Sequence, residues 1–207
     1  MIATDASLSA FAAASYTAVP TFHGAARTES IRAVVSTEGD GLVVAFPGSV
    51  TLNDWLEDFK AMPVSDSDIT TSPHGWIVHQ GFLEAADSVF DPVRDAVAGK
   101  PYALTGHSLG GAIALLIGAT LAARYDHPPI RITTFGAPRV GLGGYVDATR
   151  SMEIYEFRFG NDIVTQVPTF LEHAKGLDPI RVGEPRLDFL SCHHLPNYIA
   201  AITARGT

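Results

Sequence analysis

The segment from Tyr102 to Tyr125 places the strongest constraint on the fold, because it joins a short apolar run to a long apolar helical pattern through a Gly-x-Ser-x-Gly turn. Residues 102–105 are typical of a strand and residues 109–125 of a buried helix. Short β-branched runs alternate with helical patterns along the rest of the chain. This alternation predicts crossover connections and an α/β fold with a mostly parallel central sheet flanked by helices.

Hydrophobic periodicity and turn residues set the expected elements. Strands are expected at 31–36, 41–46, 76–79, 102–105, 130–135 and 154–159, and helices at 82–98, 109–125 and 195–204. A Gly-rich turn at 38–41 would join the first two strands as a hairpin. The length of 207 residues is that of one domain, which we expect to cover residues 1–207.

Charge and cysteine content exclude several kinds of partner. The chain has 14 Lys and Arg against 22 Asp and Glu, a net charge of −8, which disfavours nucleic acid and docking on anionic lipid through a basic patch. The single cysteine, Cys192, excludes an intramolecular disulfide. Cys192-His193-His194 lacks the four-ligand spacing of a structural zinc site. We expect no metal and no cofactor.

The N-terminal residues 1–19 contain no Lys or Arg, and Asp5 and several serines interrupt their apolar character. A secretory signal needs a positive start and a continuous apolar run, so none is expected here. The longest apolar run, 112–123, is too short for a membrane span, and no stable membrane insertion is expected. The chain as written is expected to be cytoplasmic, with a secreted form that has lost its signal as the alternative.

Ser108, at the centre of the Gly-x-Ser-x-Gly turn, is the candidate nucleophile. A nucleophile elbow needs a sharp strand-to-helix turn with a strained serine at its tip. Gly106 and Gly110 would remove the Cβ atoms that collide with neighbouring backbone in such a turn. The helix that follows would point N–H groups at developing negative charge. The alternative is an ordinary turn in which the serine caps the helix.

A serine nucleophile needs a base, and in the elbow arrangement the acid and then the histidine follow the serine. The histidines after Ser108 are His127, His173, His193 and His194. His127 lies too close to the elbow helix, and His173 lies in a polar loop without distinctive neighbours. His193 and His194 precede the last expected helix, where a loop can return above the sheet. Periodicity does not choose between these two.

Several acidic residues could orient that histidine. The aspartates after the serine are Asp126, Asp147, Asp162, Asp178 and Asp188, and several glutamates accompany them. Asp162 is favoured because it follows the expected strand 154–159 after a Gly-Asn turn. The carboxyl ends of strands in an open α/β sheet are where ligand chemistry collects.

Seven motifs occur in one order along the chain and together resemble the class 3 lipases, the family that includes the filamentous-fungal triacylglycerol lipases. They are VAFPGS (44–49), NDWLEDF (53–59), VHQGF (78–82), GHSLGGA (106–112), FGAPRVG (135–141), NDIV (161–164) followed by VP (167–168), and HLPNYI (194–199). Each motif is modest by itself, and their shared order carries the resemblance. It implies an α/β-hydrolase fold and a serine carboxylic-ester hydrolase acting through an acyl-enzyme.

The resemblance also implies a role for individual residues. Ser108 would be the nucleophile, Asp162 the orienting acid and His194 the general base. His194 is chosen because the family's histidine is followed four residues later by an aromatic residue, here Tyr198. His193 would then occupy a position where relatives often carry Asp.

The oxyanion hole implied by the resemblance consists of the backbone N–H groups of Leu109 and Ser49. The family commonly has Phe-Arg-Gly before the oxyanion serine, whereas this chain has Phe46-Pro47-Gly48. Proline offers neither charge nor N–H and fixes φ near −65°. An ion pair of the family's arginine is therefore not expected here, while the turn itself is.

Residues 51–60 form an amphipathic pattern. Leu52, Trp55, Leu56 and Phe59 fall on one helical stripe. In the resembling lipases this stretch is a mobile lid that contacts substrate and opens at a lipid–water interface. The alternative is a helix packed permanently on the core. A lid predicts that activity rises sharply once substrate exceeds its solubility limit.

The apolar stripe favours a small-molecule lipophilic ester, such as a triacylglycerol, as the substrate. A feruloyl esterase, a phospholipase and an acyltransferase on the same framework are alternatives within the family resemblance. A catalytically inactive lipid-binding module is a further alternative, although every triad and oxyanion position that the resemblance requires is filled.

Overall fold

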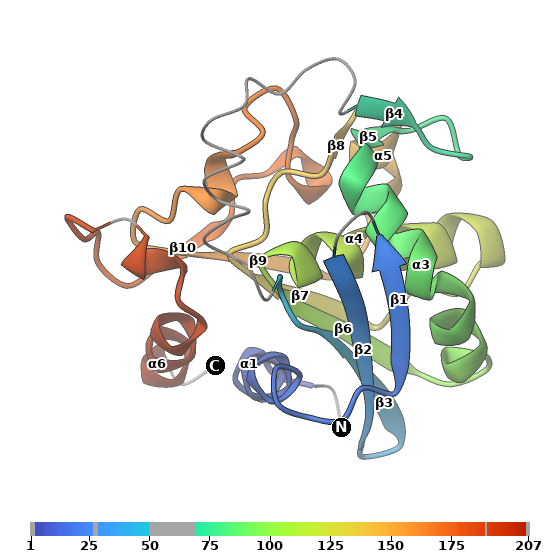
Figure 1. The fold of residues 1–207 in the computed structure, drawn as a ribbon, viewed down its shortest axis with the longest axis horizontal. Coiled ribbons are helices and arrows are strands. Elements are labelled where there is room, and N and C mark those ends of the chain that lie inside the picture. Colours follow the sequence, from blue (N-terminus) through green and yellow to red (C-terminus); the bar gives the residue numbers. More distant parts are fainter. Residues whose placement is uncertain (1–2, 27–28, 50–68, 189, 206–207) are drawn as a thin grey trace.

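A seven-stranded sheet forms the centre of the molecule (Figure 1). The computed structural model describes all residues except 1–2, 27–28, 50–68, 189 and 206–207. In spatial order the strands are β1 (Phe22–Ala26), β2 (Glu29–Glu38), β3 (Gly41–Phe46), β6 (Tyr102–His107), β7 (Arg131–Phe135), β9 (Ile154–Phe159) and β10 (Ile180–Val182). The strands from β3 to β10 are parallel, and β1 and β2 complete the sheet as antiparallel neighbours. The expected mostly parallel sheet is confirmed.

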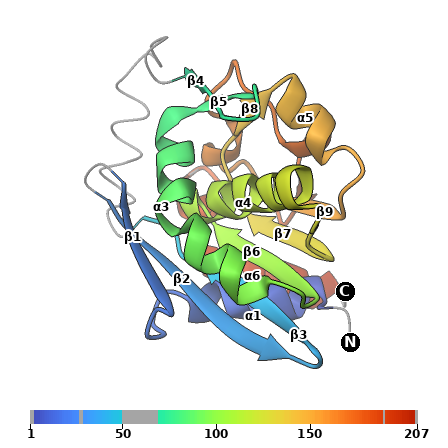
Figure 2. The same cartoon turned by 90° about the vertical axis from the view of Figure 1, so that its right-hand side faces the viewer.

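Helices cover both faces of this sheet. The helices α1 (Asp5–Ala14) and α6 (Leu195–Arg205) lie side by side on one face, and α3 (Gln80–Val97) and α4 (Leu109–Tyr125) lie on the other (Figures 1 and 2). A small sheet of β4 (Ile69–Thr71), β5 (Ile77–His79) and β8 (Gly141–Leu142) lies at one end beside α5 (Gly144–Thr149). Three 3-10 helices lie in the C-terminal third: η2 (Val164–Gln166), η3 (Ala174–Gly176) and η4 (Ser191–His193).

The main core lies between the sheet and the α3–α4 layer. In α4 every residue from 109 to 119 is buried, as its nearly uninterrupted apolar sequence predicts. In α3 the buried residues recur at helical spacing; they are Phe82, Ala85, Ala86, Val89, Val93 and Val97. The two helices pack against each other, α3 over β1 and β2 and α4 over β3, β6 and β7, so the elbow at the start of α4 is anchored in the core.

The helix α1 was not among the expected elements. Its sequence is rich in Ala and Ser, which gives a weak amphipathic pattern, yet Thr4 and Ser7 cap its first turn reciprocally. Leu8 and Ala12 are fully buried against the sheet, and Asp5 pairs with Arg131 of β7. Tertiary contacts therefore stabilise a helix that its hydrophobic pattern alone does not predict. The strands β1, β4, β8 and β10 and the helix α5 were not expected either; four of these five elements have five or fewer residues, and α5 has six.

The expected lid stripe, Leu52, Trp55, Leu56 and Phe59, lies outside the described residues. Among the helices that the structure does describe, none is both long enough and apolar enough to cross a bilayer. Within the same described ranges, no three His, Cys, Asp or Glu side chains converge in a way that would hold a metal ion.

Candidate active site

Ser108 occupies a strained turn between β6 and α4. Its φ of 56° and ψ of −129° are unusual for a residue with a side chain, and such conformations cost roughly 1–3 kcal/mol. The turn is held by a hydrogen bond of 3.0 Å from the Ser108 N–H to the Phe135 carbonyl. The Ser108 Oγ is buried and has no hydrogen-bond partner among the described residues. The structure thus shows a nucleophile elbow rather than a serine that caps its helix.

Two glycines allow the elbow to form. A Cβ on Gly110 would lie 2.1 Å from the Phe46 carbonyl oxygen, and a Cβ on Gly106 would lie 2.3 Å from backbone atoms of Gly110. Contacts this short leave no room for any side chain. The first turn of α4 therefore packs directly on the backbone of β3 and β6. The expectation that Gly106 and Gly110 remove colliding Cβ atoms is confirmed.

Asp162 and His193 form a fully buried pair at the carboxyl end of the sheet. Asp162 follows β9, and its Oδ2 lies 2.7 Å from the Nδ1 of His193. Both side chains are 0% exposed. The Nε2 of His193 has no hydrogen-bond partner among the described residues. The ring of His193 lies 4.6 Å from that of His107, the residue before Ser108, so the pair lies next to the elbow.

The choice of His194 as the base is wrong in geometry, because its side chain is exposed to solvent and does not contact Asp162. His193 ends η4, and His194 is the next residue, with φ −70° and ψ 123°. This change of backbone direction sends the two consecutive side chains different ways. The structure brings His193, and not His194, to the site.

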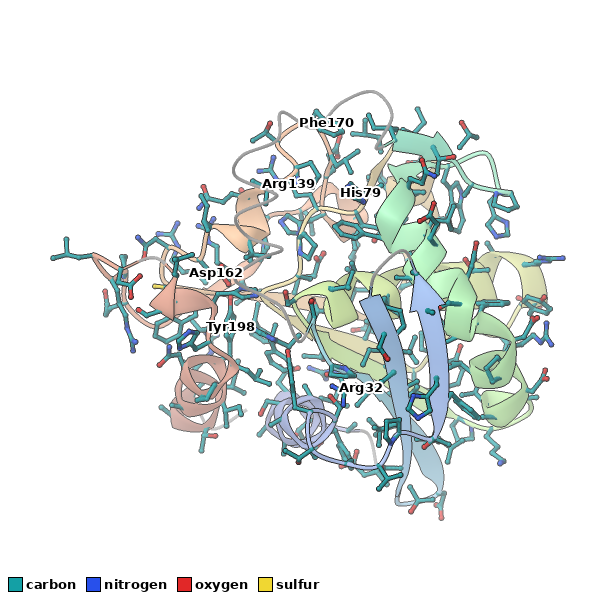
Figure 3. All side chains as sticks on the ribbon, viewed as in Figure 1. Arg32, His79, Arg139, Asp162, Phe170 and Tyr198 are labelled. Carbon is teal, nitrogen blue, oxygen red and sulfur yellow. The ribbon has the colours of Figure 1, made fainter. Side chains whose placement is uncertain are left out.

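The aromatic residue that led to His194 does reach the site. The Tyr198 hydroxyl donates to the Asp162 Oδ2 at 2.5 Å, and the two side chains lie together in Figure 3. Burial, and then the nearby Asp162 charge, raises the pKa of Tyr198 well above its usual value, so the hydroxyl stays a donor. In this chain the spacing from the paired histidine to the aromatic residue is five residues, not four.

The other oxygen of Asp162 is also bound. The Val164 N–H donates to Oδ1 at 2.9 Å, and the Thr165 hydroxyl donates to the Asp162 carbonyl at 2.9 Å. A carboxylate only accepts hydrogen bonds, and here a histidine, a tyrosine and a backbone N–H are its donors. These bonds fix the carboxylate in one orientation against His193.

Gly136, from the FGAPRVG motif, makes room for the Asp–His pair. Its φ is +64°, and a Cβ there would lie 2.9 Å from the Asp162 Oδ2 and 3.0 Å from the Nδ1 and Cε1 of His193. The backbone after β7 therefore packs directly on the hydrogen-bonded pair. Only glycine fits this position on both grounds.

The segments that carry Ser49 and Leu109 flank the serine, as the sequence analysis expects. Leu109 is the first residue of α4, so its N–H has no acceptor within the helix. Gly48 follows β3, and a Cβ on it would lie 3.0 Å from the Ser108 Cβ. Ser49 is buried at the same strand end. Backbone after β3 and at the start of α4 thus lies next to Ser108.

His173, which lies in a polar loop of the sequence, is buried in a second pair. Its Nδ1 lies 2.9 Å from the Glu156 Oε1, and its Nε2 lies 2.7 Å from the Thr165 carbonyl. Burial by itself lowers the pKa of His173, but the Glu156 charge and these two hydrogen bonds outweigh it and leave the pKa raised. No spacing in the sequence indicates this pair, because Glu156 lies in β9 and His173 in a loop.

Two further side chains from the motifs lie toward the same end of the molecule as Asp162 (Figure 3). His79 is buried and its ring stacks on Phe82 at 4.1 Å. Arg139 donates to the Thr169 carbonyl at 3.0 Å. In the described part of the chain this hydrogen bond ties the segment after β7 to the loop that carries Thr169.

The parallel sheet, the elbow serine and the buried Asp–His pair, in the chain order Ser, Asp, His, are those of an α/β-hydrolase. Residues 43–172 match the family Lipase (class 3), which is more than half of the 207 residues. The chain belongs to the class 3 lipase family.

Known proteins agree with this membership. Over 122 residues the chain is 33% identical to Toxin TseL of Vibrio cholerae, covering 56% of this chain and 19% of that protein. Over 136 residues it is 32% identical to secreted mono- and diacylglycerol lipase 1 of Fusarium solani, covering 61% of this chain and 39% of that protein. The chain therefore spans less than half the length of these curated relatives.

A solved structure confirms the fold. The triacylglyceride lipase of Rhizomucor miehei superposes with a TM-score of 0.63 at 24% sequence identity, covering 79% of this chain and 65% of that one. The expected α/β-hydrolase fold is confirmed.

Proposed function

We propose that this chain is a serine hydrolase of lipophilic carboxylic esters. The observation that carries the proposal is the placement of Ser108, at a strained elbow, beside the buried His193–Asp162 pair. The Ser108 Oγ and the His193 Nε2 are both buried and both lack a partner among the described residues. An unpaired buried polar atom normally costs about 1–3 kcal/mol, so two of them at the carboxyl end of the sheet indicate a place for a reacting group.

In the proposed reaction the Ser108 Oγ attacks the ester carbonyl carbon while the His193 Nε2 takes its proton. Asp162, which accepts from the His193 Nδ1, holds the ring in the tautomer with a free Nε2 and stabilises the imidazolium. The backbone N–H groups of Leu109 and Ser49 would bind the oxyanion; one such donor is worth about 10²–10³-fold in turnover.

The tetrahedral intermediate then collapses. The imidazolium of His193 returns the proton to the leaving alcohol, and the acyl group stays on Ser108. Water, deprotonated by the same Nε2, attacks the acyl-enzyme, and the imidazolium then returns the proton to the Ser108 Oγ as the acid leaves. All proton transfers pass through one atom, which is why its accessibility to Ser108 decides whether the site is active.

The substrate class is proposed from the relatives. The Fusarium solani protein is a mono- and diacylglycerol lipase, and family membership favours acyl esters of lipids. A lipid–water interface, rather than a dissolved partner, would then present the substrate. Feruloyl esters, phospholipid acyl chains and transfer of the acyl group to an alcohol are outcomes that the assay below separates.

The test is release of p-nitrophenol from a series of esters from acetyl to palmitoyl, with wild type and Ser108→Ala. The proposal expects turnover that falls to background in Ser108→Ala, and a chain-length profile that separates a lipase from a short-chain esterase. Labelling with a fluorophosphonate supplies an independent readout. A folded wild type that neither hydrolyses any ester nor becomes labelled at Ser108 would overturn the proposal in favour of a binding module.

A further inference from the structure

Tyr16, beyond the end of α1, reaches the site from a remote part of the chain. Its hydroxyl accepts the Gly48 N–H at 2.9 Å and lies 2.7 Å from the Nδ1 of His107. The Nε2 of His107 lies 2.7 Å from the carbonyl oxygen of His193. Two side chains thus connect the backbone before Ser49, the residue before Ser108 and the backbone of His193.

The direction of each of these three hydrogen bonds follows from elementary chemistry. A carbonyl only accepts, so the His107 Nε2 carries a proton and donates to His193. Burial lowers the pKa of His107 well below its usual value, so the ring is neutral and its Nδ1 is an acceptor. A backbone N–H only donates, so the Tyr16 hydroxyl accepts a hydrogen bond from Gly48. The same hydroxyl donates a hydrogen bond to the His107 Nδ1.

The hydroxyl keeps that proton under all ordinary conditions. Burial, partly offset by the Gly48 hydrogen bond and the charge of Arg32, raises the pKa of Tyr16 to about 12. The hydrogen-bond network therefore has a single arrangement of protons. In it Gly48 donates to Tyr16, Tyr16 donates to His107, and His107 donates to the His193 carbonyl. A network with one arrangement holds its members rigidly, because no alternative pairing competes.

The three segments that the network joins are those that must align for acyl transfer. Gly48 precedes the proposed oxyanion donor Ser49, His107 precedes Ser108, and His193 is the proposed base. We propose that Tyr16 and His107 are positioning residues that keep the oxyanion segment and the base in register with the nucleophile. This inference rests on the proposed ester hydrolysis.

The space around Gly48 shows how tightly this register is held. A Cβ on Gly48 would lie 2.6 Å from the Tyr16 hydroxyl and 3.0 Å from the His107 carbonyl oxygen. The oxyanion segment is thus enclosed between the tyrosine and the elbow backbone. Because an error of about 1 Å in a catalytic group costs up to about 10²-fold in rate, losing the hydroxyl should affect turnover rather than binding.

The experiment compares Tyr16→Phe with Tyr102→Phe. Tyr102 is a matched control: its hydroxyl also bridges distant segments, donating to the His127 carbonyl at 2.7 Å, but it lies at the start of β6, whereas His107 lies at its end. Both variants lose one tyrosine hydroxyl. We expect Tyr16→Phe to lower kcat by roughly 10- to 100-fold with KM within about twofold, and Tyr102→Phe to change neither.

Two substitutions at His107 test its two hydrogen bonds separately. His107→Gln places an amide near the former Nε2 and retains a donor for the His193 carbonyl, whereas His107→Asn places one near Nδ1 and retains an acceptor for Tyr16. We expect each to retain part of the lost activity relative to His107→Ala. In the Tyr16→Phe background, the advantage of His107→Asn over His107→Ala should disappear, because its partner hydroxyl is gone.

The outcomes separate this inference from the proposed function. Wild type inert to esters and to the fluorophosphonate would overturn the function. Active wild type with Tyr16→Phe and Tyr102→Phe equally active would overturn the positioning role alone. If Tyr16→Phe loses activity only in step with its melting temperature, and Tyr102→Phe does the same, the role of Tyr16 is structural and the inference is also wrong.

Discussion

Two carboxylate–histidine pairs lie in or just after the same strand, β9. They differ in whether the Nε2 of the histidine has a hydrogen-bond partner. Glu156 lies within β9 and binds His173, while Asp162 follows β9 and binds His193, in both cases through Nδ1. His173 also uses its Nε2, which lies 2.7 Å from the Thr165 carbonyl. The Nε2 of His193 has no partner among the described residues. We call Glu156–His173 the saturated pair, because both ring nitrogens are hydrogen-bonded, and Asp162–His193 the unsaturated pair, because the Nε2 has no partner among the described residues.

The difference separates a structural pair from the pair proposed to react. His173 has both nitrogens bound to acceptors, so it holds its proton and fastens Glu156 to the loop that carries Thr165 and Asp162. His193 has its Nδ1 fixed by Asp162, and its Nε2 is the proposed proton acceptor. A buried His–carboxylate contact by itself is therefore poor evidence of catalysis; the unsatisfied nitrogen beside a strained serine is the stronger sign.

The largest expected effect comes from His193. We expect His193→Ala to lower kcat on a p-nitrophenyl ester by roughly 10⁴- to 10⁶-fold, because Ser108 loses its only proposed proton acceptor. His194→Ala is the matched control on the adjacent, exposed residue and should stay within a few fold of wild type. Equal losses in the two variants, or a larger loss in His194→Ala, would mean that the assignment of the base must return to His194.

A smaller effect is expected at Gly136, whose backbone packs on the unsaturated Asp162–His193 pair. Gly136→Ala should lower kcat by roughly 10²-fold, because its Cβ would lie 2.9 Å from the Asp162 Oδ2 and displace the pair. Gly143→Ala supplies the control, since Gly143 has a similar φ of +55° but nothing within 4 Å of a built Cβ. Both variants place alanine at a positive φ, which costs about 1–3 kcal/mol. Similar activities in the two would show that Gly136 serves the turn rather than the pair.

The saturated pair should affect stability and leave catalysis nearly intact. His173→Gln should lower the free energy of unfolding by about 3 kcal/mol, because it leaves the buried Glu156 without its charged partner. Its kcat, measured well below the melting temperature, should remain within a few fold of wild type. A loss of activity comparable to that of His193→Ala would break the distinction between the two pairs.

The pH dependence of this effect has a defined sign. The pKa of His173 is raised in the folded protein, so its contribution is complete below the unfolded pKa of about 6.5 and is lost as pH rises through the raised value. The difference in unfolding free energy between wild type and His173→Gln should therefore shrink from pH 6 to pH 9. Glu156→Gln should abolish the same dependence. A difference that grows with pH would contradict a charged His173.

Local patterns were sufficient for much of the fold and part of the site. The helix expected at 109–125 has those bounds, and the strands expected at 41–46 and 154–159 do as well. The periodicity of apolar residues and the glycines of the turn are short-range features, so they identify Ser108 at an elbow and Asp162 after a strand. The family motifs added roles for individual residues and favoured His194 as the base, whereas the structure pairs His193 with Asp162.

Only the tertiary structure decided which atoms meet. His193 and His194 are chemically identical and adjacent, and the end of η4 alone determines which of them faces Asp162. Tyr16 reaches His107 across 91 positions of sequence, and Glu156 reaches His173 across 17. Local periodicity records which face of an element is buried. It carries no record of which loops converge at the end of a sheet, because that depends on how all the strands and helices pack together.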